Sequence, residues 1–352
     1  MSFELLDECG AKKIVLCRDA ETGLRGVIAI HSTTLGPAAG GLRMKAYADE
    51  REAMRDALRL ARAMTYKYAA SGIAVGGAKA VIIGDPSTHK SDELLRSFGR
   101  FIEELGGEYS AGEDVGTNGH DMEILAESTQ WLVSLPEEAG GPGDVSHTTA
   151  RGVRQAMRAC AEHVFGSPEL TDRSVAIQGL GQVGAKLARL LAAEGARLVV
   201  ADIDDERARA VADEVGARVA APEDILESDV DIVAPCALGD AVNEHNVNRI
   251  HANIVAGAAN NVMASEAIAD RLQSRGRVYA VDYVANAGGI VYDDWMIQRP
   301  RPATFDHDAA LARVDAIYDR TREVLQRATA DELPYRVAAE RLAEATLHNA
   351  SR

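Results

Sequence analysis

Residues 174–184 read SVAIQGLGQVG, an apolar strand followed at once by three glycines and the start of a helix. In this setting Gly179 allows a tight turn, Gly181 lets the backbone approach a pyrophosphate at the helix N-terminus, and Gly184 lets helix and strand pack closely. Such glycines are weak evidence alone, but the strand–turn–helix context is the one that dinucleotide binding requires. The residues expected around the phosphates are Gly179, Leu180, Gly181, Gln182, Val183 and Gly184.

The next expected strand, 197–202, ends at Asp202, about twenty residues after the glycines, where a carboxylate accepts the hydroxyls of an adenosine ribose. Acids at 204–206 make this corner more negative and would repel a 2′-phosphate. The pattern therefore favours NAD over NADP as the cofactor. The alternative is that Arg207 turns inward and binds the 2′-phosphate.

Strands and helices alternate on both sides of the glycine turn, which predicts an α/β fold with a parallel sheet and right-handed crossovers. In the second half we expect strands at 174–178, 197–202, near 219, 231–234, 254–256 and 278–280, and helices at 149–164, 183–194, 206–215, 308–328 and 335–348. In the first half we expect strands at 13–17, 26–31 and 78–83, and helices at 49–69 and 91–105. The glycine-rich segment 137–144, EEAGGPGD, is the expected boundary between two domains.

The composition excludes several partners. The 352 residues include 38 Lys and Arg against 54 Asp and Glu, for a net charge of −16, which argues against nucleic acid and anionic membranes. No stretch approaches the ~18 apolar residues of a membrane span, and no signal peptide is recognised. The four cysteines form no CxxC pair, so we predict a cytoplasmic protein without disulfides and assign no metal ligand.

Four short motifs in the first half carry charged residues beside glycines. GGLRM at 40–44 is interpreted as a glycine turn before Arg43, and MTYK at 64–67 ends a helix at Lys67. GGAK at 76–79 places Lys79 within an apolar strand, and GEDVGT at 112–117 is interpreted as a loop that carries Asp114. Lysine is rarely buried without a partner, so Lys79 is expected to emerge at a cleft.

Two lysines near a carboxylate can bind an anionic substrate, while burial and like charge lower the pKa of one of them. A lysine with a lowered pKa can act as a general base. The plainer alternative is that Lys67 is a solvated residue at a helix end and that the acids of the 112–117 motif solvate a loop.

At these residues the sequence resembles the leucine/phenylalanine/valine dehydrogenases, amino-acid dehydrogenases of the wider glutamate dehydrogenase superfamily. The resemblance extends over nearly the whole chain and keeps the order of the motifs. The matching strings are GPAAGGLRM (36–44), MTYKYAA (64–70), GGAKAVIIGDP (76–86), GEDVGT (112–117), QGLGQVG (178–184), APCALG (234–239), AGAANN (256–261) and DYVANAGGIV (282–291).

The resemblance implies reversible oxidative deamination of an L-amino acid to a 2-oxo acid and ammonia. It implies that Lys67, helped by Gly40 and Gly41, holds the substrate carboxylate, and that Lys79 activates the attacking water. Asp114 would move protons at the amino group. We expect Arg43 to complete a small cationic pocket with the two lysines.

The resemblance also implies a homo-oligomer with a substrate domain at 1–143 and a Rossmann NAD-binding domain at 144–329. The C-terminal helix, 330–352, would return to the first domain, and the cofactor would lie across a cleft from the lysines. The residues expected at the cofactor are Thr149, Cys236, Ala237, Asn260, Asn261 and Asn286, with Asn261 also near the substrate amine and Ile290 on the substrate side.

Three positions bear on the side chain of the substrate. Ala39 lies where glutamate-specific relatives carry a lysine, so glutamate is disfavoured, and Gly112 is expected to enlarge the same pocket. Both favour a neutral, bulky or aromatic side chain. Asp293 replaces an apolar pocket residue of leucine-type members; it either points to solvent or faces the substrate and favours a polar or cationic side chain.

Two other functions compete with amino-acid deamination. The same scaffold could oxidise a hydroxy acid or an unusual amine, or the chain could be a catalytically silent NAD-binding regulator. The presence of Lys67, Lys79 and Asp114 together argues against the silent regulator, which has no need of all three.

Overall fold

The computed structural model describes residues 2–137, 141–297 and 305–350. The chain divides into two compact units: Met1–Asp144 with Asp293–His307 and Ala343–Arg352, and Val145–Tyr292 with Asp308–Leu342. The expected assignment of all of 330–352 to the first domain is therefore wrong. Gln273 explains why, because its side chain donates to the carbonyl of Leu333 and accepts from the amide of Tyr335, both at 2.9 Å, and so anchors the start of this segment to the second unit.

The first unit is built on a mixed five-stranded sheet in the order β1-β2-β4-β3-β5. The strand β2 runs antiparallel to its two neighbours, β1 and β4, whereas β3 runs parallel to both β4 and β5. Their bounds are β1 Lys13–Asp19, β2 Leu24–Ser32, β3 Ala38–Lys45, β4 Gly76–Ile83 and β5 Tyr109–Glu113.

Two of these strands correct the sequence analysis. Gly40 and Gly41 were expected in a turn but lie inside β3, next to the central strand β4, and the 112–117 motif begins on β5 rather than in a loop. Glycines are common in turns, but these two glycines instead allow neighbouring backbones to approach closely. A Cβ atom on Gly40 would lie 1.8 Å from the carbonyl oxygen of Ala78.

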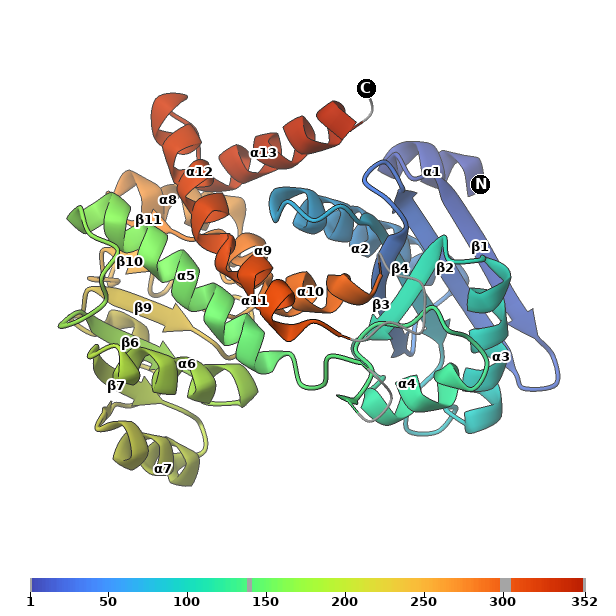
Figure 1. Cartoon of the computed structure of the whole chain (residues 1–352), viewed down its shortest axis with the longest axis horizontal. Coiled ribbons are helices and arrows are strands. Elements are labelled where there is room, and N and C mark those ends of the chain that lie inside the picture. Colours follow the sequence, from blue (N-terminus) through green and yellow to red (C-terminus); the bar gives the residue numbers. More distant parts are fainter. Residues whose placement is uncertain (1, 138–140, 298–304, 351–352) are drawn as a thin grey trace. The chain divides into compact units, whose positions relative to one another are not determined.

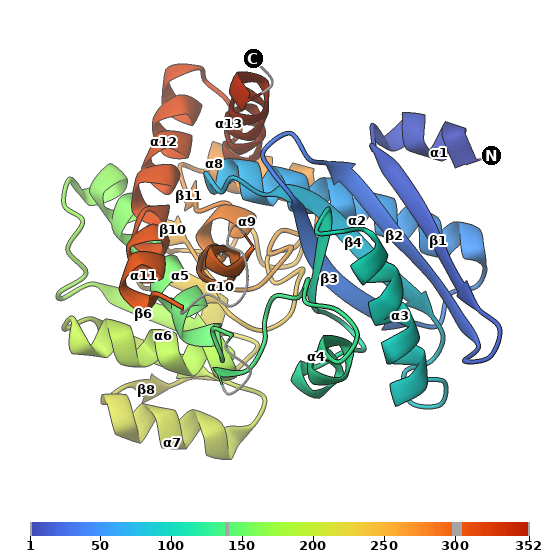
Figure 2. The same cartoon turned by 45° about the vertical axis from the view of Figure 1, so that its right-hand side comes forward.

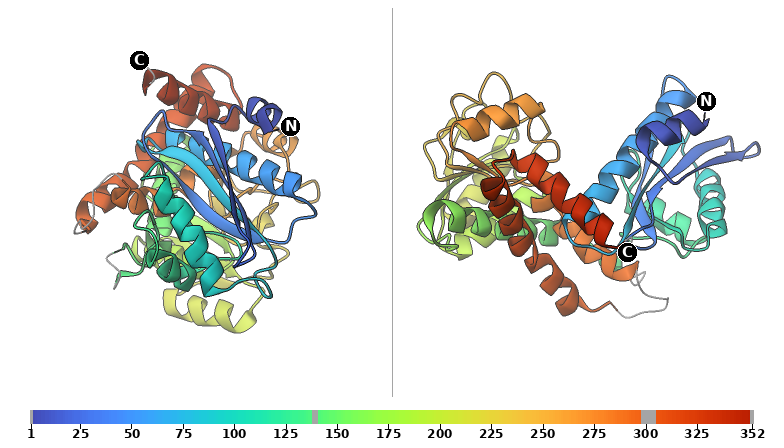
Figure 3. Two further views of the ribbon diagram at one scale, coloured as in Figure 1. Left: turned by 90° about the vertical axis from the view of Figure 1, so that its right-hand side faces the viewer. Right: turned by 90° about the horizontal axis from the view of Figure 1, so that it is seen from above.

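Helices cover both faces of this sheet (Figures 1 and 2). The helices are α1 Ser2–Cys9, α2 Glu50–Ala70, α3 Asp92–Glu104 and α4 Gly119–Ala126. Because side chains alternate along a strand, Ala29 and Val81 pack with α2, whereas Ile28 and Ile82 pack with α3. Figure 3 shows α3 against the face of the strands opposite to α2.

The C-terminal end of α2 packs directly onto β4. A Cβ atom on Gly77 would lie 2.1 Å from Thr65 Oγ1 and 2.2 Å from the amide nitrogen of Thr65, so only glycine permits this approach. Lys67 follows two residues later in the last turn of α2, and Lys79 lies two residues further along β4 on the same face as Gly77. The glycine therefore brings the backbones that carry both lysines close together.

The second unit contains a parallel six-stranded sheet in the order β11-β10-β9-β6-β7-β8. This confirms the predicted fold class. The strands are β6 Ser174–Gln178, β7 Arg197–Ala201, β8 Arg218–Val219, β9 Ile232–Pro235, β10 Ile254–Val255 and β11 Val278–Tyr279. All six lie where the alternation of apolar strands and helices predicted them.

The helices of this unit cover its sheet on both faces (Figure 1). They are α5 Ser146–Phe165, α6 Gln182–Ala193, α7 Asp205–Val215, α8 Glu266–Ser274, α9 Asp282–Ala285, α10 Gly288–Asp293, α11 His307–Asp315, α12 Ile317–Ala330 and the first part of α13 Tyr335–Ala350, with the short 3₁₀ turn η2 Ile225–Glu227. The 3₁₀ turn η3 Asp294–Met296 and the end of α13 from Ala343 belong to the first unit. The single helix expected at 308–328 is two helices, α11 and α12, that meet at Ala316.

The cysteines and the helices also bear on the predictions from composition. Cys9, Cys17, Cys160 and Cys236 are all free thiols. None of the described helices is long and apolar enough to cross a membrane.

Candidate active site

The centre of the candidate site is Lys79 on the central strand β4. The residue is 6% exposed, and its Nζ lies 2.9 Å from Asp114 Oδ2. The lysine was expected to emerge at a cleft, but it is buried and has the ionic partner that a buried ammonium requires.

Glycine backbone lies directly beside this pair. A Cβ atom on Gly41 would lie 3.1 Å from Lys79 Nζ and 2.8 Å from Asp114 Cβ. Gly41 and Lys79 occupy neighbouring positions on the parallel strands β3 and β4, so both face the α2 side of the sheet. The absence of a side chain at Gly41 thus leaves bare backbone against the two charged groups.

Burial is the main cause of the altered pKa of Lys79. It lowers the pKa of the ammonium, and the like charge of Arg43 acts in the same direction, while the carboxylates of Asp114 and Asp56 oppose it. The net pKa lies below the ordinary lysine value. Lys79 therefore loses its proton at a lower pH than a solvated lysine, as a general base requires.

Asp114 follows β5 directly and is held by two cations. Lys79 Nζ and Arg43 Nε, at 2.9 and 2.8 Å, both bind Oδ2. The backbone amide of Asp114 also donates to Thr117 Oγ1 at 2.9 Å. Burial alone would raise the pKa of this carboxyl, but the ion pairs with Lys79 and Arg43 hold it below its usual range, so Asp114 is ionised at neutral pH.

The guanidinium of Arg43, expected at the substrate carboxylate, binds two carboxylates of the chain, and its contact with a substrate stays a prediction. Besides Asp114, it binds Asp56 Oδ2 at 3.1 Å. Asp56 lies on α2 between the buried Ala53 and Ala57 and was missed by the sequence analysis. The sequence pattern could have identified Asp56, because the helical spacing places this carboxylate beside the buried face of α2.

Lys67 lies in the last turn of α2 and is half-buried. Its place at the end of a helix matches the sequence analysis. Its role in binding a carboxylate stays a prediction.

The enlargement of a pocket by Gly112 is contradicted. A Cβ atom there would lie 2.8 Å from Val133 Cγ2 and 3.3 Å from Ser134 Oγ, so the chain after α4 already fills this space. Ala39 is fully buried on β3, two residues before Gly41 and on the same face of the sheet.

Asp293 does not point to solvent, since it is only 6% exposed. Its Oδ1 accepts from the Ser134 amide at 2.9 Å and its Oδ2 accepts from the Ser134 hydroxyl at 2.6 Å. Ser134 has a backbone φ of 60°, an uncommon conformation for a residue other than glycine. Asp293 therefore stabilises a strained turn of the first unit.

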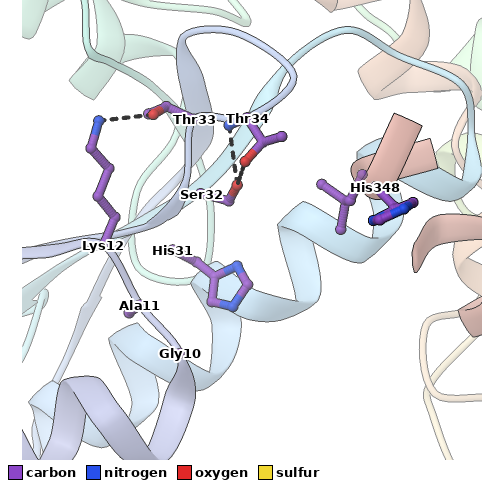
Figure 4. A pocket seen from close by; sticks show the side chains of 9 residues that line it. Gly10, Ala11, Lys12, His31, Ser32, Thr33, Thr34 and His348 are labelled. Atoms are coloured by element: carbon purple, nitrogen blue, oxygen red, sulfur yellow. Dashed lines mark hydrogen bonds between the residues drawn. The ribbon is translucent and has the colours of Figure 1, made fainter. Parts of the chain in front are cut away.

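The first unit also contains a hollow of about 420 Å³, lined by residues 10–12, 31–34 and 347–348 (Figure 4). Lys12 binds Thr33 and Glu108, Ser32 binds Thr34, and His31 Nδ1 lies 2.9 Å from Thr65 Oγ1. These polar side chains are hydrogen-bonded within the protein. The Lys79–Asp114 pair differs because it lies against the bare backbone of Gly41.

In the second unit the three glycines after β6 have the geometry that was predicted for each. Gly179 has a φ of 88°, and a Cβ on it would lie 2.8 Å from the Ala237 Cβ. A Cβ on Gly184 would lie 1.9 Å from the Gly179 carbonyl oxygen, so α6 packs tightly on the turn. Gly181 is the N-cap of α6, and a Cβ on it would meet no described atom within 4 Å.

The N-terminus of α6 has the properties of a phosphate site. Among the described residues no side chain caps this helix, whose first residues are Gln182 and Val183. Free amides and the helix dipole at such an end attract an anion. The amide of Leu180, by contrast, donates to Asp202 Oδ2 at 2.6 Å and is used within the protein.

Asp202 is 7% exposed at the carboxyl end of β7. Its Oδ1 accepts from the Asp204 amide at 2.9 Å and lies 3.3 Å from Arg207 NH1. Burial would raise the pKa of Asp202, but these hydrogen bonds and Arg207 hold it below its usual range. A carboxylate accepts about four hydrogen bonds, so capacity remains for ribose hydroxyls.

Most other residues expected at a cofactor lie at the carboxyl edge of this sheet. Cys236 and Ala237 follow β9, next to Gly179, which follows the neighbouring strand β6, at the point where the strand order reverses. Asn286 Nδ2 donates to Asn260 Oδ1 at 2.8 Å. Asn261 is exposed with a φ of 53°, while Thr149 in the first turn of α5 and Ile290 in α10 are half-buried.

Two kinds of alternative chemistry lack support in the site. Burial raises the pKa of the Cys236 thiol to about 12, so it is not a thiolate nucleophile. In the part of the chain that the structure describes, no three His, Cys, Asp or Glu side chains cluster as metal ligands would.

Comparison with known proteins agrees with this geometry. Residues 12–131 match the family described as Glu/Leu/Phe/Val dehydrogenase, dimerisation domain, and residues 140–216 and 200–352 match the family described as Glutamate/Leucine/Phenylalanine/Valine dehydrogenase. The leucine dehydrogenase of Bacillus subtilis (strain 168) is 42% identical over 97% of this chain and 93% of that protein. The valine dehydrogenase of Streptomyces albus is 45% identical over 96% of this chain and 92% of that protein.

A solved structure extends the comparison to three dimensions. The crystal structure of L-tryptophan dehydrogenase from Nostoc punctiforme superposes with a TM-score of 0.90, covers 100% of both chains and is 37% identical.

The glycines of the second unit make a matched pair of variants. We expect Gly181→Ala to cost less than about 1 kcal/mol in the free energy of unfolding, because its Cβ enters open space. It should weaken dinucleotide binding about tenfold or more by keeping the phosphates away from the backbone. Gly184→Ala should instead cost about 1–3 kcal/mol, because its Cβ meets a carbonyl oxygen.

Urea unfolding and fluorescence titration with NADH measure both quantities. Unchanged NADH affinity in Gly181→Ala would contradict the assignment of the phosphate site, whereas Gly184→Ala serves as the control for effects that act through folding.

Proposed function

The chain belongs to the Glu/Leu/Phe/Val dehydrogenase family of amino-acid dehydrogenases, and we propose that it catalyses the reversible, NAD-dependent oxidative deamination of a neutral L-amino acid. The products are the 2-oxo acid and ammonia. The observation that carries the proposal is the buried Lys79, which is paired with Asp114 beside the bare backbone of Gly41. The turn at 179–184 and Asp202 support a pyridine nucleotide as the cofactor.

In the proposed reaction Lys67 holds the substrate carboxylate, which fixes the position of the substrate Cα. Bound NAD supplies the hydride acceptor, and loss of hydride from Cα leaves an iminium group on the substrate. In its unprotonated form, which the lowered pKa favours relative to a solvated lysine, Lys79 takes a proton from water as the oxygen attacks the iminium carbon.

Asp114 completes the reaction by moving protons on the resulting carbinolamine. It takes the hydroxyl proton and returns a proton to the amino group, so that ammonia leaves as the carbonyl of the 2-oxo acid forms. Lys79 and Asp114 share a hydrogen bond, so the proton taken from water can pass between them.

The substrate class follows from the absence of a charge at Ala39 and from the contacts of Asp293. The buried methyl group of Ala39 offers no cation to a side-chain carboxylate, so glutamate is a poor substrate. Asp293 is engaged with Ser134, which removes the support for a cationic side chain. We propose a neutral substrate, with a bulky side chain favoured because Ala39 leaves more room than a leucine would.

The first test is ammonia-dependent oxidation of NADH with the 2-oxo acids of Phe, Trp, Leu, Val, Glu and Lys. Lys79→Ala should lower kcat at least about 100-fold, the usual contribution of a general base, while NADH still binds. Lys90→Ala is the matched control, because Lys90 also pairs with a carboxylate, Asp121 at 2.8 Å, but belongs to no predicted site.

Absence of turnover with every 2-oxo acid would contradict the function, and near-normal turnover of Lys79→Ala would contradict the mechanism. NADH binding without turnover would favour the silent regulator.

The preference for NAD is tested by measuring kcat/KM with NAD and with NADP. We expect NAD to be preferred by about tenfold or more, because the ionised Asp202 repels a 2′-phosphate. Arg207 binds Asp202 and Asp204, at 3.3 and 3.1 Å, and would have to leave both to bind that phosphate. A preference for NADP would show that Arg207 leaves these two carboxylates and binds the 2′-phosphate.

We also propose that the enzyme is a homo-oligomer. The matched dimerisation family spans 12–131, and β1 lies at the edge of its sheet with Leu16 67% exposed. An edge strand with exposed apolar residues is suited to pairing with another chain. A mass of 37.5 kDa by light scattering, that of one chain, would refute the proposal.

A further inference from the structure

The two cations at Asp114 bind the same carboxylate oxygen. Arg43 Nε and Lys79 Nζ both contact Oδ2, at 2.8 and 2.9 Å. Among the residues that the structure describes, none donates a hydrogen bond to Oδ1. The carboxylate is thus held from one side and has one oxygen left for other partners.

Arg43 is itself fixed by a second carboxylate. Its NH1 binds Asp56 Oδ2 at 3.1 Å, and Tyr47 donates to the same oxygen at 2.9 Å. Arg59 binds the other oxygen of Asp56 at 2.8 Å. The side chains of Arg43 and Asp56 are 19% and 15% exposed, so this chain of ion pairs is largely shielded from solvent.

From this arrangement we propose that Arg43 is the positioning residue of Asp114, held by Asp56, and that Asp114 Oδ1 is the oxygen that exchanges protons with the substrate. The proposal rests on the function proposed above, and it replaces a substrate-binding role for Arg43. An arginine suits the role because its planar guanidinium binds two carboxylates in fixed directions, which an ammonium does not do.

Several charged and titratable groups surround Asp114. They are Lys79 from β4, Arg43 from β3 and Asp56 from α2, with the phenols of Tyr47 and Tyr109 nearby. Arg43 lowers the pKa of Asp114 and also that of Lys79. Loss of its charge therefore raises both pKa values, so the acid limb of the pH profile moves to higher pH.

The test compares Arg43→Gln and Arg43→Lys with the wild-type enzyme in oxidative deamination across pH. Arg43→Gln should lower kcat about tenfold or more, leave KM for the amino acid within about threefold, and move the acid limb of kcat to higher pH. Arg43→Lys, which keeps the charge, should keep the acid limb in place while kcat recovers only in part. Asp56→Asn should change kcat in the same direction as Arg43→Gln but less.

A large rise in KM with unchanged kcat would show that Arg43 binds the substrate carboxylate, and an unmoved pH profile would show that it does not act through Asp114. Either result overturns the proposal.

A second measurement does not need turnover. The rate at which acetic anhydride modifies Lys79, followed by peptide mass spectrometry from pH 6 to 11, reports the titration of its amine. The midpoint should move to higher pH in Arg43→Gln but not in Arg43→Lys, with Lys90 in the same sample as the internal control.

An unmoved midpoint in a folded Arg43→Gln protein overturns the proposal. A wild-type enzyme inactive on every amino acid would instead refute the proposed function, and the two failures are therefore distinguishable.

Discussion

The first unit is organised around one buried charge. Lys79 lies on the central strand of a sheet, 6% exposed, and an ammonium in that place is stable only if a carboxylate reaches it. Asp114 reaches it because β5 ends one residue earlier, two strands away, and because Gly41 on the strand between them has no side chain to separate the charges. Gly41 thus makes room for the ion pair, whereas Gly40 and Gly77 each remove a Cβ atom where two backbones meet.

In the second unit, glycines have a different structural role. Gly179 and Gly184 close the turn between β6 and α6, while Gly181 leaves the helix N-terminus open. Asp202 accepts a hydrogen bond from the amide of Leu180 and stays ionised at the end of β7. The carboxylate that we propose binds the ribose therefore also holds the glycine turn in place.

The sequence could predict the second unit almost completely, since its information is local: six strands, the glycine turn and Asp202 follow from patterns within about thirty residues. The first unit was harder. A glycine can serve a turn or a close approach, and only the register of β3 against β4 and β5 distinguishes the two. Gly112 was misinterpreted because the sequence does not show that Val133 lies against it, and the ion pairs of Arg43 with Asp114 and Asp56 could not be predicted from the sequence either.

The sequence by itself determined the family, the α/β class, the glycine turn after β6 and the choice of Lys79 and Asp114 as the proposed reactive pair. These depend on residue types at fixed spacings along the chain. Only the tertiary structure decided which carboxylate oxygen the cations occupy, that Arg43 binds Asp114, and that Asp293 stabilises the turn at Ser134. Those facts depend on contacts between residues 35 to 159 positions apart, and a buried charged side chain points toward the partner that offsets its loss of solvation.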